Sequence, residues 1–168
     1  MIELLRTGAA ALVLLATITV AMQAAELPDT IAAKGEVVVT QLHAEGAQIY
    51  ECKADASGQL TWQFREPVAS LFLNGATVGR HYAGPTWESG GSTVVGKAVG
   101  RAPGAESKDI PWLKLEVSEQ HGDGPLKHVK TVQRINTKGG NADGKCQKSG
   151  ELHAEPYSAD YVFLRTAS

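Results

Sequence analysis

The chain has 168 residues and a formal net charge of −2, with 43% hydrophobic and 20% charged residues. A near-neutral chain without a block of Lys and Arg does not attract nucleic acid or anionic membranes by charge. Composition therefore excludes the strongly basic binding classes, and we expect no nucleic-acid partner.

The first 25 residues have the layout of a secretory leader. Arg6 lies in a short charged opening, an apolar run extends from Ala9 to Met22, and two alanines precede Glu26. The run is shorter than the ~20 residues that span a bilayer, and no stop-transfer charges follow it. We therefore expect residues 1–25 to be a signal peptide that exports the protein to the periplasm or the extracellular space, with no membrane insertion after leader removal.

The remaining residues, 26–168, predict a single all-β domain. Short segments rich in Val, Ile, Thr, Tyr and Trp alternate with turn signals such as Asn74-Gly75 and Asp123-Gly124, and helical periodicity is almost absent. About ten short antiparallel strands in one domain predict a β-barrel or a β-sandwich, and the sequence does not choose between them. A short helical turn is expected at 29–33. The expected strands are 36–42, 47–53, 60–64, 69–73, 78–82, 92–98, 112–119, 127–136, 152–154 and 158–164.

Two of these strands indicate which side chains face the core. Apolar and polar residues alternate along both, and in a strand alternate side chains share a face. The side chains expected to face inward are Leu113, Leu115 and Val117 in the first strand, and Tyr157, Ala159, Tyr161 and Phe163 in the second.

Cys52 and Cys146 are the two cysteines of the chain. In an exported protein two cysteines most simply form one disulfide. A reactive thiol or a metal pair is the alternative, but there is no CxxC motif and no histidine at short metal-ligand spacing from either cysteine. GxGxxG, GxSxG and HExxH motifs are also absent from the sequence. We therefore expect a structural disulfide, no metal site and no cofactor.

The densest group of chemically capable side chains is the block from His81 to Glu88, HYAGPTWE. In one interpretation, His81 and Glu88 form an acid/base pair at a barrel mouth, and Tyr82 and Trp87 stack on a flat or sugar-like ligand. In the other, which we favour, Gly84-Pro85 makes a tight turn, Trp87 fills the core and His81 bonds a backbone carbonyl.

A second cluster places Arg134, Asn136 and Thr137 near Asp160 and Tyr161 if strand 158–164 pairs with strand 127–136. An ion pair between Arg134 and Asp160 is the simplest expectation, and recruitment of Arg134 to a carboxylate ligand is the alternative. The candidate ligand-binding residues are therefore His81, Tyr82, Trp87, Glu88, Arg134 and Asp160.

Several motifs resemble an exported family of uncharacterised proteins, domain of unknown function 3455 (DUF3455). The resemblance covers about residues 28–165 and implies export without implying an activity. The residues that carry it are Gly46–Cys52, Trp62–Phe64, Pro67–Leu71, His81–Glu88, Gly91-Ser92, Trp112-Leu113, Gln133–Thr137, Gly139-Gly140, Cys146 and Tyr157–Phe163.

Three functions remain open at this point. We favour non-catalytic binding of a small molecule, a glycan or an envelope partner, because no complete catalytic constellation is present. The alternatives are a hydrolase or isomerase that uses His81 and Glu88, and a structural or stress-related envelope protein. The sequence leaves the ligand, the oligomeric state and the final compartment undetermined.

Overall fold

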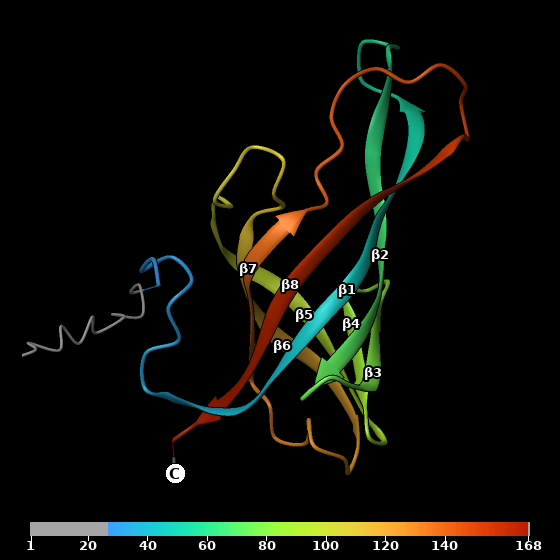
Figure 1. Cartoon of the computed structure of the whole chain (residues 1–168). Helices are drawn as coiled ribbons and strands as arrows, with labels where there is room; N and C mark the ends of the chain where they lie inside the picture. Colours follow the sequence, from blue (N-terminus) through green and yellow to red (C-terminus); the bar gives the residue numbers. More distant parts are fainter. Residues whose placement is uncertain (1–26, 168) are drawn as a thin grey trace, which may run out of the picture.

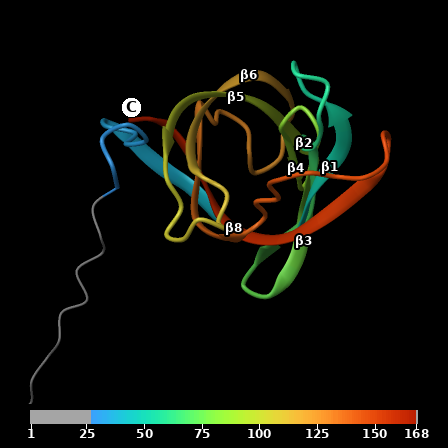
Figure 2. The same cartoon turned by 90° about the horizontal axis from the view of Figure 1, so that it is seen from above.

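The structure is a computed structural model that describes residues 27–167, and the expected leader, residues 1–25, lies outside this range. Eight antiparallel strands form one sheet, and the last strand pairs with the first, so the sheet closes into a barrel (Figures 1 and 2). The all-β prediction is confirmed, and of the two architectures left open the barrel is the one formed. In chain order around the ring, the strands are β1 (Glu36–Ala54), β2 (Leu60–Leu73), β3 (Ala76–Tyr82), β4 (Thr86–Ser89), β5 (Ser92–Ala102), β6 (Trp112–Gly122), β7 (Thr131–Gly139) and β8 (Leu152–Thr166).

None of the described residues belong to a helix with the length and apolar character that crossing a bilayer requires.

Side chains at alternate positions of the strands fill the interior of the barrel, as the sequence predicted. Inward-facing side chains pack into one hydrophobic cluster, and their neighbours in the chain face outward. The two strands with a predicted orientation present the expected side chains to this cluster: Leu113, Leu115 and Val117 in β6, and Tyr157, Ala159, Tyr161 and Phe163 in β8.

Three of the observed strands are longer than the sequence indicated. The expected segments 36–42 and 47–53 are one strand, β1, and β2 and β8 likewise each join two expected segments. In β1 the apparent break contains Ala44 and Gly46, which favour strands weakly by propensity. Ala44 is nevertheless fully buried, and a side chain at Gly46 would overlap the carbonyl of Val68 on β2. Close packing at these positions keeps the strand continuous.

Two other expectations about local structure are wrong. β4 was not predicted, because it has four residues and directly follows the turn at Gly84-Pro85. The expected helical turn at 29–33 is a hydrogen-bonded turn without a helix, in which the Ile31 N–H donates to the Pro28 carbonyl over 2.9 Å.

One end of the barrel is closed by the loop between β6 and β7, residues 123–130, which lies at the bottom of Figure 1. Leu126 and Val129 of this loop are fully buried in the same cluster as Phe163. The Leu126 N–H donates to Ser92 Oγ over 3.0 Å and anchors the loop. Because these two side chains turn into the barrel, β7 begins at Thr131 and not at the expected residue 127.

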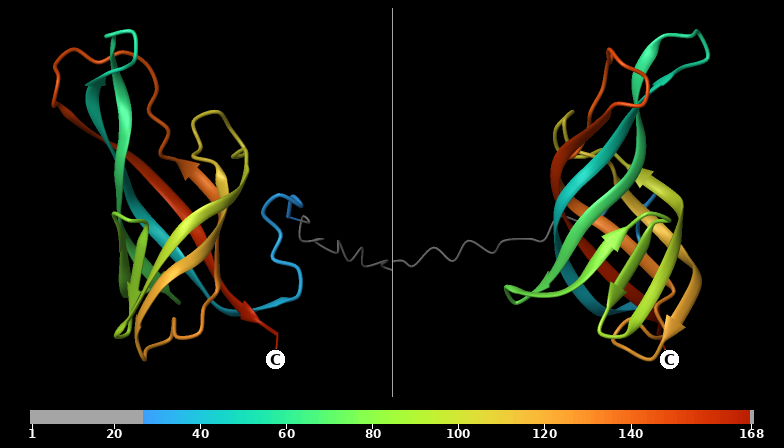
Figure 3. Two further views of the ribbon diagram at one scale, coloured as in Figure 1. Left: turned by 180° about the vertical axis from the view of Figure 1, so that it is seen from behind. Right: turned by 90° about the vertical axis from the view of Figure 1, so that its right-hand side faces the viewer.

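At the opposite end β1, β2 and β8 extend beyond the other strands (Figures 1 and 3). Residues 140–151, which we call the strap, connect β7 to β8 and run along the free edge of β2. In the strap the Cys146 N–H donates to the Leu60 carbonyl over 3.2 Å, and the Trp62 N–H donates to the Gly144 carbonyl over 3.2 Å. The predicted disulfide between Cys52 and Cys146 is formed, with a Cα–Cα distance of 5.8 Å, and it fastens the strap to β1.

Candidate functional site

The barrel contains a cavity of about 1190 Å³ at the end that carries the strap. An eight-stranded barrel is wide enough to hold one small ligand. This volume is slightly above the usual range for sites that hold drug-sized ligands. Trp87, deep in the cavity, is 1% exposed, whereas Phe64 at the mouth is 55% exposed. The cavity therefore leads from solvent into the interior of the barrel.

An aromatic cluster forms the floor of this cavity. The ring of Trp87 stacks on His81, with centroids 4.6 Å apart and planes 9° from parallel. Tyr161 meets Trp87 edge-on at 5.3 Å, and Phe163 does so at 6.2 Å. His81, Trp87 and Tyr161 line the cavity, whereas Phe163 belongs to the packed core. Trp87 therefore forms the boundary between the two.

His81 is a neutral imidazole with a defined tautomer. Its Nδ1 lies 2.8 Å from the Thr86 carbonyl, and because a carbonyl only accepts, Nδ1 carries the proton. Burial lowers the pKa of His81 to about 3; the hydrogen bond to Thr86 opposes this effect, and the nearby charge of Arg134 adds to it. The ring is therefore uncharged at neutral pH and suited to packing.

Three tyrosine hydroxyls lie at or next to the cavity wall. Tyr50 and Tyr161 line the cavity, and the Tyr157 hydroxyl is 3.3 Å from that of Tyr161. Burial raises the pKa of all three phenols. They are therefore protonated at neutral pH and can both donate and accept hydrogen bonds.

Arg134 supplies the positive charge inside the barrel. It is the cross-strand partner of Tyr161, and its Nε and Nη2 donate to the Pro111 carbonyl over 3.1 and 2.9 Å. Within residues 27–167 it forms no ion pair with a carboxylate. Its charge lowers the pKa of Tyr161 and Tyr157 and so partly offsets the effect of burial. A partly buried guanidinium without a counter-ion can bind an anion or a carbonyl oxygen.

The mouth has an aromatic wall on one side and the strap on the other. Tyr50, Trp62 and Phe64 form the wall, with Tyr50 and Phe64 in edge contact at 5.9 Å. The Tyr50 hydroxyl donates to the Gly140 carbonyl over 2.7 Å and so links the wall to the strap. Gly140 has a φ of 86°, a conformation that favours glycine. This hydrogen bond fixes the start of the strap beside the mouth.

The structure brings together three of the six predicted site residues: His81, Trp87 and Arg134 all line the cavity. As one interpretation of the sequence expected, Trp87 is buried and His81 bonds a backbone carbonyl, yet both also face the cavity.

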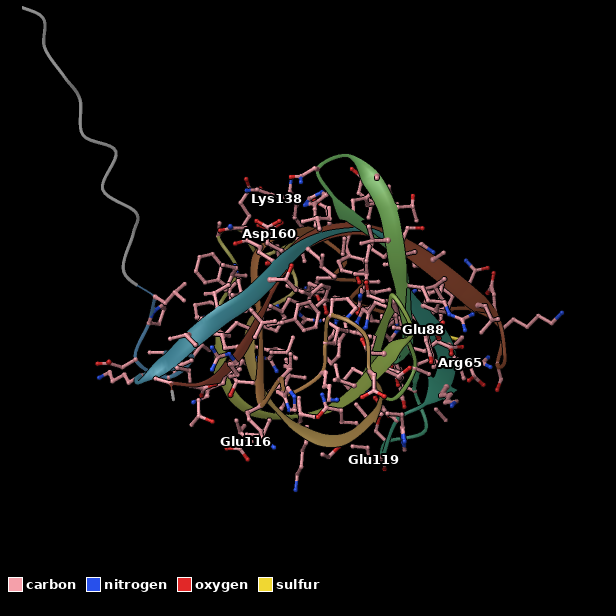
Figure 4. The ribbon with its side chains drawn as sticks, turned by 90° about the horizontal axis from the view of Figure 1, so that it is seen from below. Arg65, Glu88, Glu116, Glu119, Lys138 and Asp160 are labelled. Carbon is pink, nitrogen blue, oxygen red and sulfur yellow. A yellow bond between two sulfur atoms is a disulfide. The ribbon has the colours of Figure 1, made fainter. Side chains whose placement is uncertain are left out.

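Tyr82 and Glu88 are not among the cavity-lining residues. Glu88 pairs across the strands with Arg80, whose Nη2 donates to Glu88 Oε2 over 2.8 Å, and the Tyr82 hydroxyl is 3.4 Å from the same oxygen. Because Glu88 follows Trp87 in the strand, it faces the opposite side of the sheet, at the periphery of the ring in Figure 4. His81 and Glu88 therefore do not form an acid/base pair, which would need hydrogen-bond reach or one bridging water.

Asp160 also lies on the outside of the barrel (Figure 4). Its carboxylate accepts hydrogen bonds of 2.9 Å from His43 Nδ1 and from Asn136 Nδ2. The last two strands do pair, as expected, but Arg134 lies opposite Tyr161, and Asp160 lies opposite Ile135. The expected Arg134–Asp160 ion pair is therefore wrong, because the two side chains face opposite sides of the sheet.

Sequence analysis missed the polar residue Gln48 and the mouth aromatics Tyr50, Trp62 and Phe64. A signal for Gln48 was present, because it continues the inward positions of β1 through Leu42, Ala44 and Gly46. It was not recognised because β1 was divided into two segments at this point.

The cavity offers groups for ring stacking and for hydrogen bonding. It combines stacked aromatic rings, neutral hydroxyls, a neutral imidazole and one guanidinium deep in the barrel. Within residues 27–167 no group of three or more His, Cys, Asp and Glu side chains has an arrangement that could hold a metal ion.

Comparison with known proteins gives a family and no named relative. The model of the family described as "Protein of unknown function (DUF3455)" matches residues 32–77 and 72–165. No curated protein and no solved structure matches the chain.

Proposed function

The chain belongs to the DUF3455 family, whose function is unknown, and we propose that it binds a small organic molecule with a flat apolar body inside the barrel, without transforming it. The observation that carries this proposal is the cavity with a Trp87–His81 floor and an aromatic wall of Tyr50, Trp62 and Phe64. A concave site lined by aromatic side chains with a few polar groups is typical of ligand pockets.

Non-catalytic binding is favoured over hydrolysis or isomerisation by the arrangement of the titratable groups. His81 is neutral and its Nδ1–H is engaged by a backbone carbonyl, while Glu88 faces the outside. We further propose that the protein acts after export. The expected leader and the disulfide between Cys52 and Cys146 support this location.

Binding can be tested with N-phenyl-1-naphthylamine, a neutral aromatic probe whose fluorescence rises in apolar surroundings. We expect the leaderless protein to bind it, and we expect a double variant that fills the cavity, Leu113→Trp/Ala142→Trp, to bind it at least about tenfold more weakly. Leu113 and Ala142 both line the cavity. The matched control is Val38→Trp/Val68→Trp, which places the same rings at exposed positions.

Absence of probe binding by the wild-type protein, or equal binding by the cavity-filling and control variants, would contradict the proposal. Circular dichroism of each variant verifies that the barrel is folded, so that a loss of binding reports on the cavity.

A further inference from the structure

Two buried N–H donors line the cavity and lack a well-formed hydrogen bond. Gln48 is 2% exposed and Trp87 is 1% exposed. Among residues 27–167, Trp87 Nε1 has no hydrogen-bond acceptor, and Gln48 Nε2 has none with full hydrogen-bond geometry, although its approach to the Tyr157 hydroxyl lowers the pKa of that phenol. Because most buried polar groups in proteins have a partner, these two donors indicate that the occupant of the cavity carries acceptor atoms.

Arg134 adds a charged donor to the same space. A guanidinium has five N–H donors in a planar fork; the Pro111 carbonyl engages the Nε and Nη2 groups, and the Tyr161 hydroxyl accepts a further hydrogen bond from this side chain. The hydroxyl of Tyr161, its cross-strand partner, is protonated and can donate beside it. One of the donors in this space therefore carries a full positive charge.

The charged residues around the cavity also favour an anion. Four cationic side chains and two carboxylates line the cavity and its mouth, and one of the cations, Arg65, is paired with Glu66 over 3.1 Å; an excess of one positive charge remains, and His81 is neutral. A positive potential at a concave opening raises the local concentration of anions. These charged residues are Arg65, Lys97, Arg101, Arg134, Glu119 and Asp143.

We propose that the ligand class of this cavity is an aromatic monocarboxylate, with its ring against Trp87 and its carboxylate on Arg134 and Gln48 Nε2. This inference rests on the proposed function and narrows it. The planar fork of Arg134 matches a carboxylate in two-point geometry. The deep donors comprise one guanidinium, one amide and one indole, with the other cations at the mouth. This set suits a single planar anion better than a phosphate dianion, which would need further positive charge beside it.

The test compares 2-naphthoate with its neutral isostere 2-naphthamide by isothermal titration calorimetry at pH 7. We expect naphthoate to bind the leaderless wild-type protein about tenfold more tightly, because hydrogen bonds to charged groups are stronger than those between neutral ones. In the variant Arg134→Gln, the affinity for naphthoate should fall about tenfold, while the affinity for naphthamide should change less than about twofold. The matched control is Arg101→Gln, which removes the same charge at the mouth and should change naphthoate affinity less than about threefold.

Equal affinity for the two compounds, or no affinity for either in a protein that binds N-phenyl-1-naphthylamine, would overturn the carboxylate inference and leave the proposed function intact. Equal weakening of both compounds in Arg134→Gln would also overturn it. If Arg134→Gln does not fold, Gln48→Met provides the same test. We expect this variant to bind naphthoate about fivefold more weakly, which corresponds to the loss of one net hydrogen bond. An unchanged affinity for naphthoate would contradict the assignment.

Discussion

The two ends of the barrel are built from the same strands but differ in what their inward-facing positions carry. At the closed end, Leu126, Val129 and Phe163 pack into a continuous apolar cluster. At the open end, the inward positions carry polar groups such as Gln48 and Arg134, and the buried indole N–H of Trp87 has no hydrogen-bond partner among residues 27–167. The closed end satisfies the rules of core packing, whereas the open end departs from them, and such departures in natural proteins concentrate at functional sites. We therefore expect substitutions at the closed end to affect mainly stability, and substitutions at the open end to affect mainly binding.

The same substitution at the two ends should give the largest contrast. Phe163→Ala removes a fully buried ring that contacts Trp87, and we expect it to lower the free energy of unfolding by about 3–5 kcal/mol. Phe64→Ala removes a ring that is 55% exposed at the mouth, and we expect a loss below about 1 kcal/mol. Urea denaturation followed by circular dichroism measures both. Equal losses would show that the mouth is packed as tightly as the core.

Removal of the disulfide should give the next largest change in the free energy of unfolding. The bond joins positions 94 residues apart, and the double variant Cys52→Ser/Cys146→Ser should lower the free energy of unfolding by about 2–4 kcal/mol. Because the bond fastens the strap to β1, amide exchange should accelerate in residues 140–151 before it does in the loop that closes the other end. Reduced wild-type protein is the control and should behave like the variant. Uniform acceleration along the chain would contradict a local role of the disulfide at the mouth.

The floor of the cavity should make stability depend on pH. His81 has a pKa of about 3 when folded and about 6.5 when unfolded, so the unfolded chain binds a proton that the folded chain does not between these values. Stability therefore falls as the pH decreases from about 6.5 toward 3, by on the order of a few kcal/mol in total.

In the variant His81→Phe this part of the pH dependence should disappear. Asp109, whose pKa is lowered chiefly by the hydrogen bond from the Gly139 N–H, also loses its contribution in acid, but it does so in both proteins. The difference in unfolding free energy between wild type and variant, measured at pH 7 and pH 4.5, isolates His81. A difference that does not change with pH would show that His81 can be protonated within the fold.

The smallest effect should come from the hydrogen bond between the wall and the strap. Tyr50→Phe removes the donor to the Gly140 carbonyl and should cost about 1 kcal/mol. Tyr82→Phe is the matched control, because its hydroxyl lies outside the barrel at 3.4 Å from Glu88 and should contribute less. Thermal unfolding compares the two. A larger loss of thermal stability in Tyr82→Phe than in Tyr50→Phe would contradict this expectation. It would indicate that the contacts of Tyr82 and Arg80 with Glu88 on the outer face stabilise the barrel more than the hydrogen bond at the mouth does.

The sequence correctly predicted the features that depend on a single strand, such as which side chains face inward. Alternation in β6 and β8 gave the correct inward faces, because the direction of a side chain along a strand follows from its position alone. Which side chains meet across strands depends on register, and a shift of one residue moves a side chain to the other face. For that reason the expected ion pair between Arg134 and Asp160 is absent, because Arg134 lies opposite Tyr161 and Asp160 lies opposite Ile135. In the same way His81 lies opposite Trp87, while Glu88 pairs with Arg80 on the outer face.

Irregularities in the ladders explain why the rest of the site was not predicted. The pairing of β1 with β2 shifts between Ile49 and Tyr50, and that of β7 with β8 shifts between Ile135 and Lys138. Each shift changes which residues face inward beyond it in the strand that carries the extra residue, which at the first shift is β2, and no turn residue in the sequence marks it. Trp62 and Phe64 of the aromatic wall lie beyond the first shift in β2 and were not predicted, whereas Tyr50 keeps the inward phase of Gln48 in β1.

By itself, the sequence determined the all-β class, the partnership of Cys52 with Cys146 and the inward faces of two strands, because composition, cysteine number and alternation are local properties. The tertiary structure decided the closure of the sheet, the position of the loop 123–130 that closes one end, and the cavity at the other end. These features depend on register and on which strands meet. The same holds for the electrostatics of the site. Arg134 shifts the pKa values of His81 and Tyr161 only because the closed sheet brings β3, β7 and β8 around one cavity.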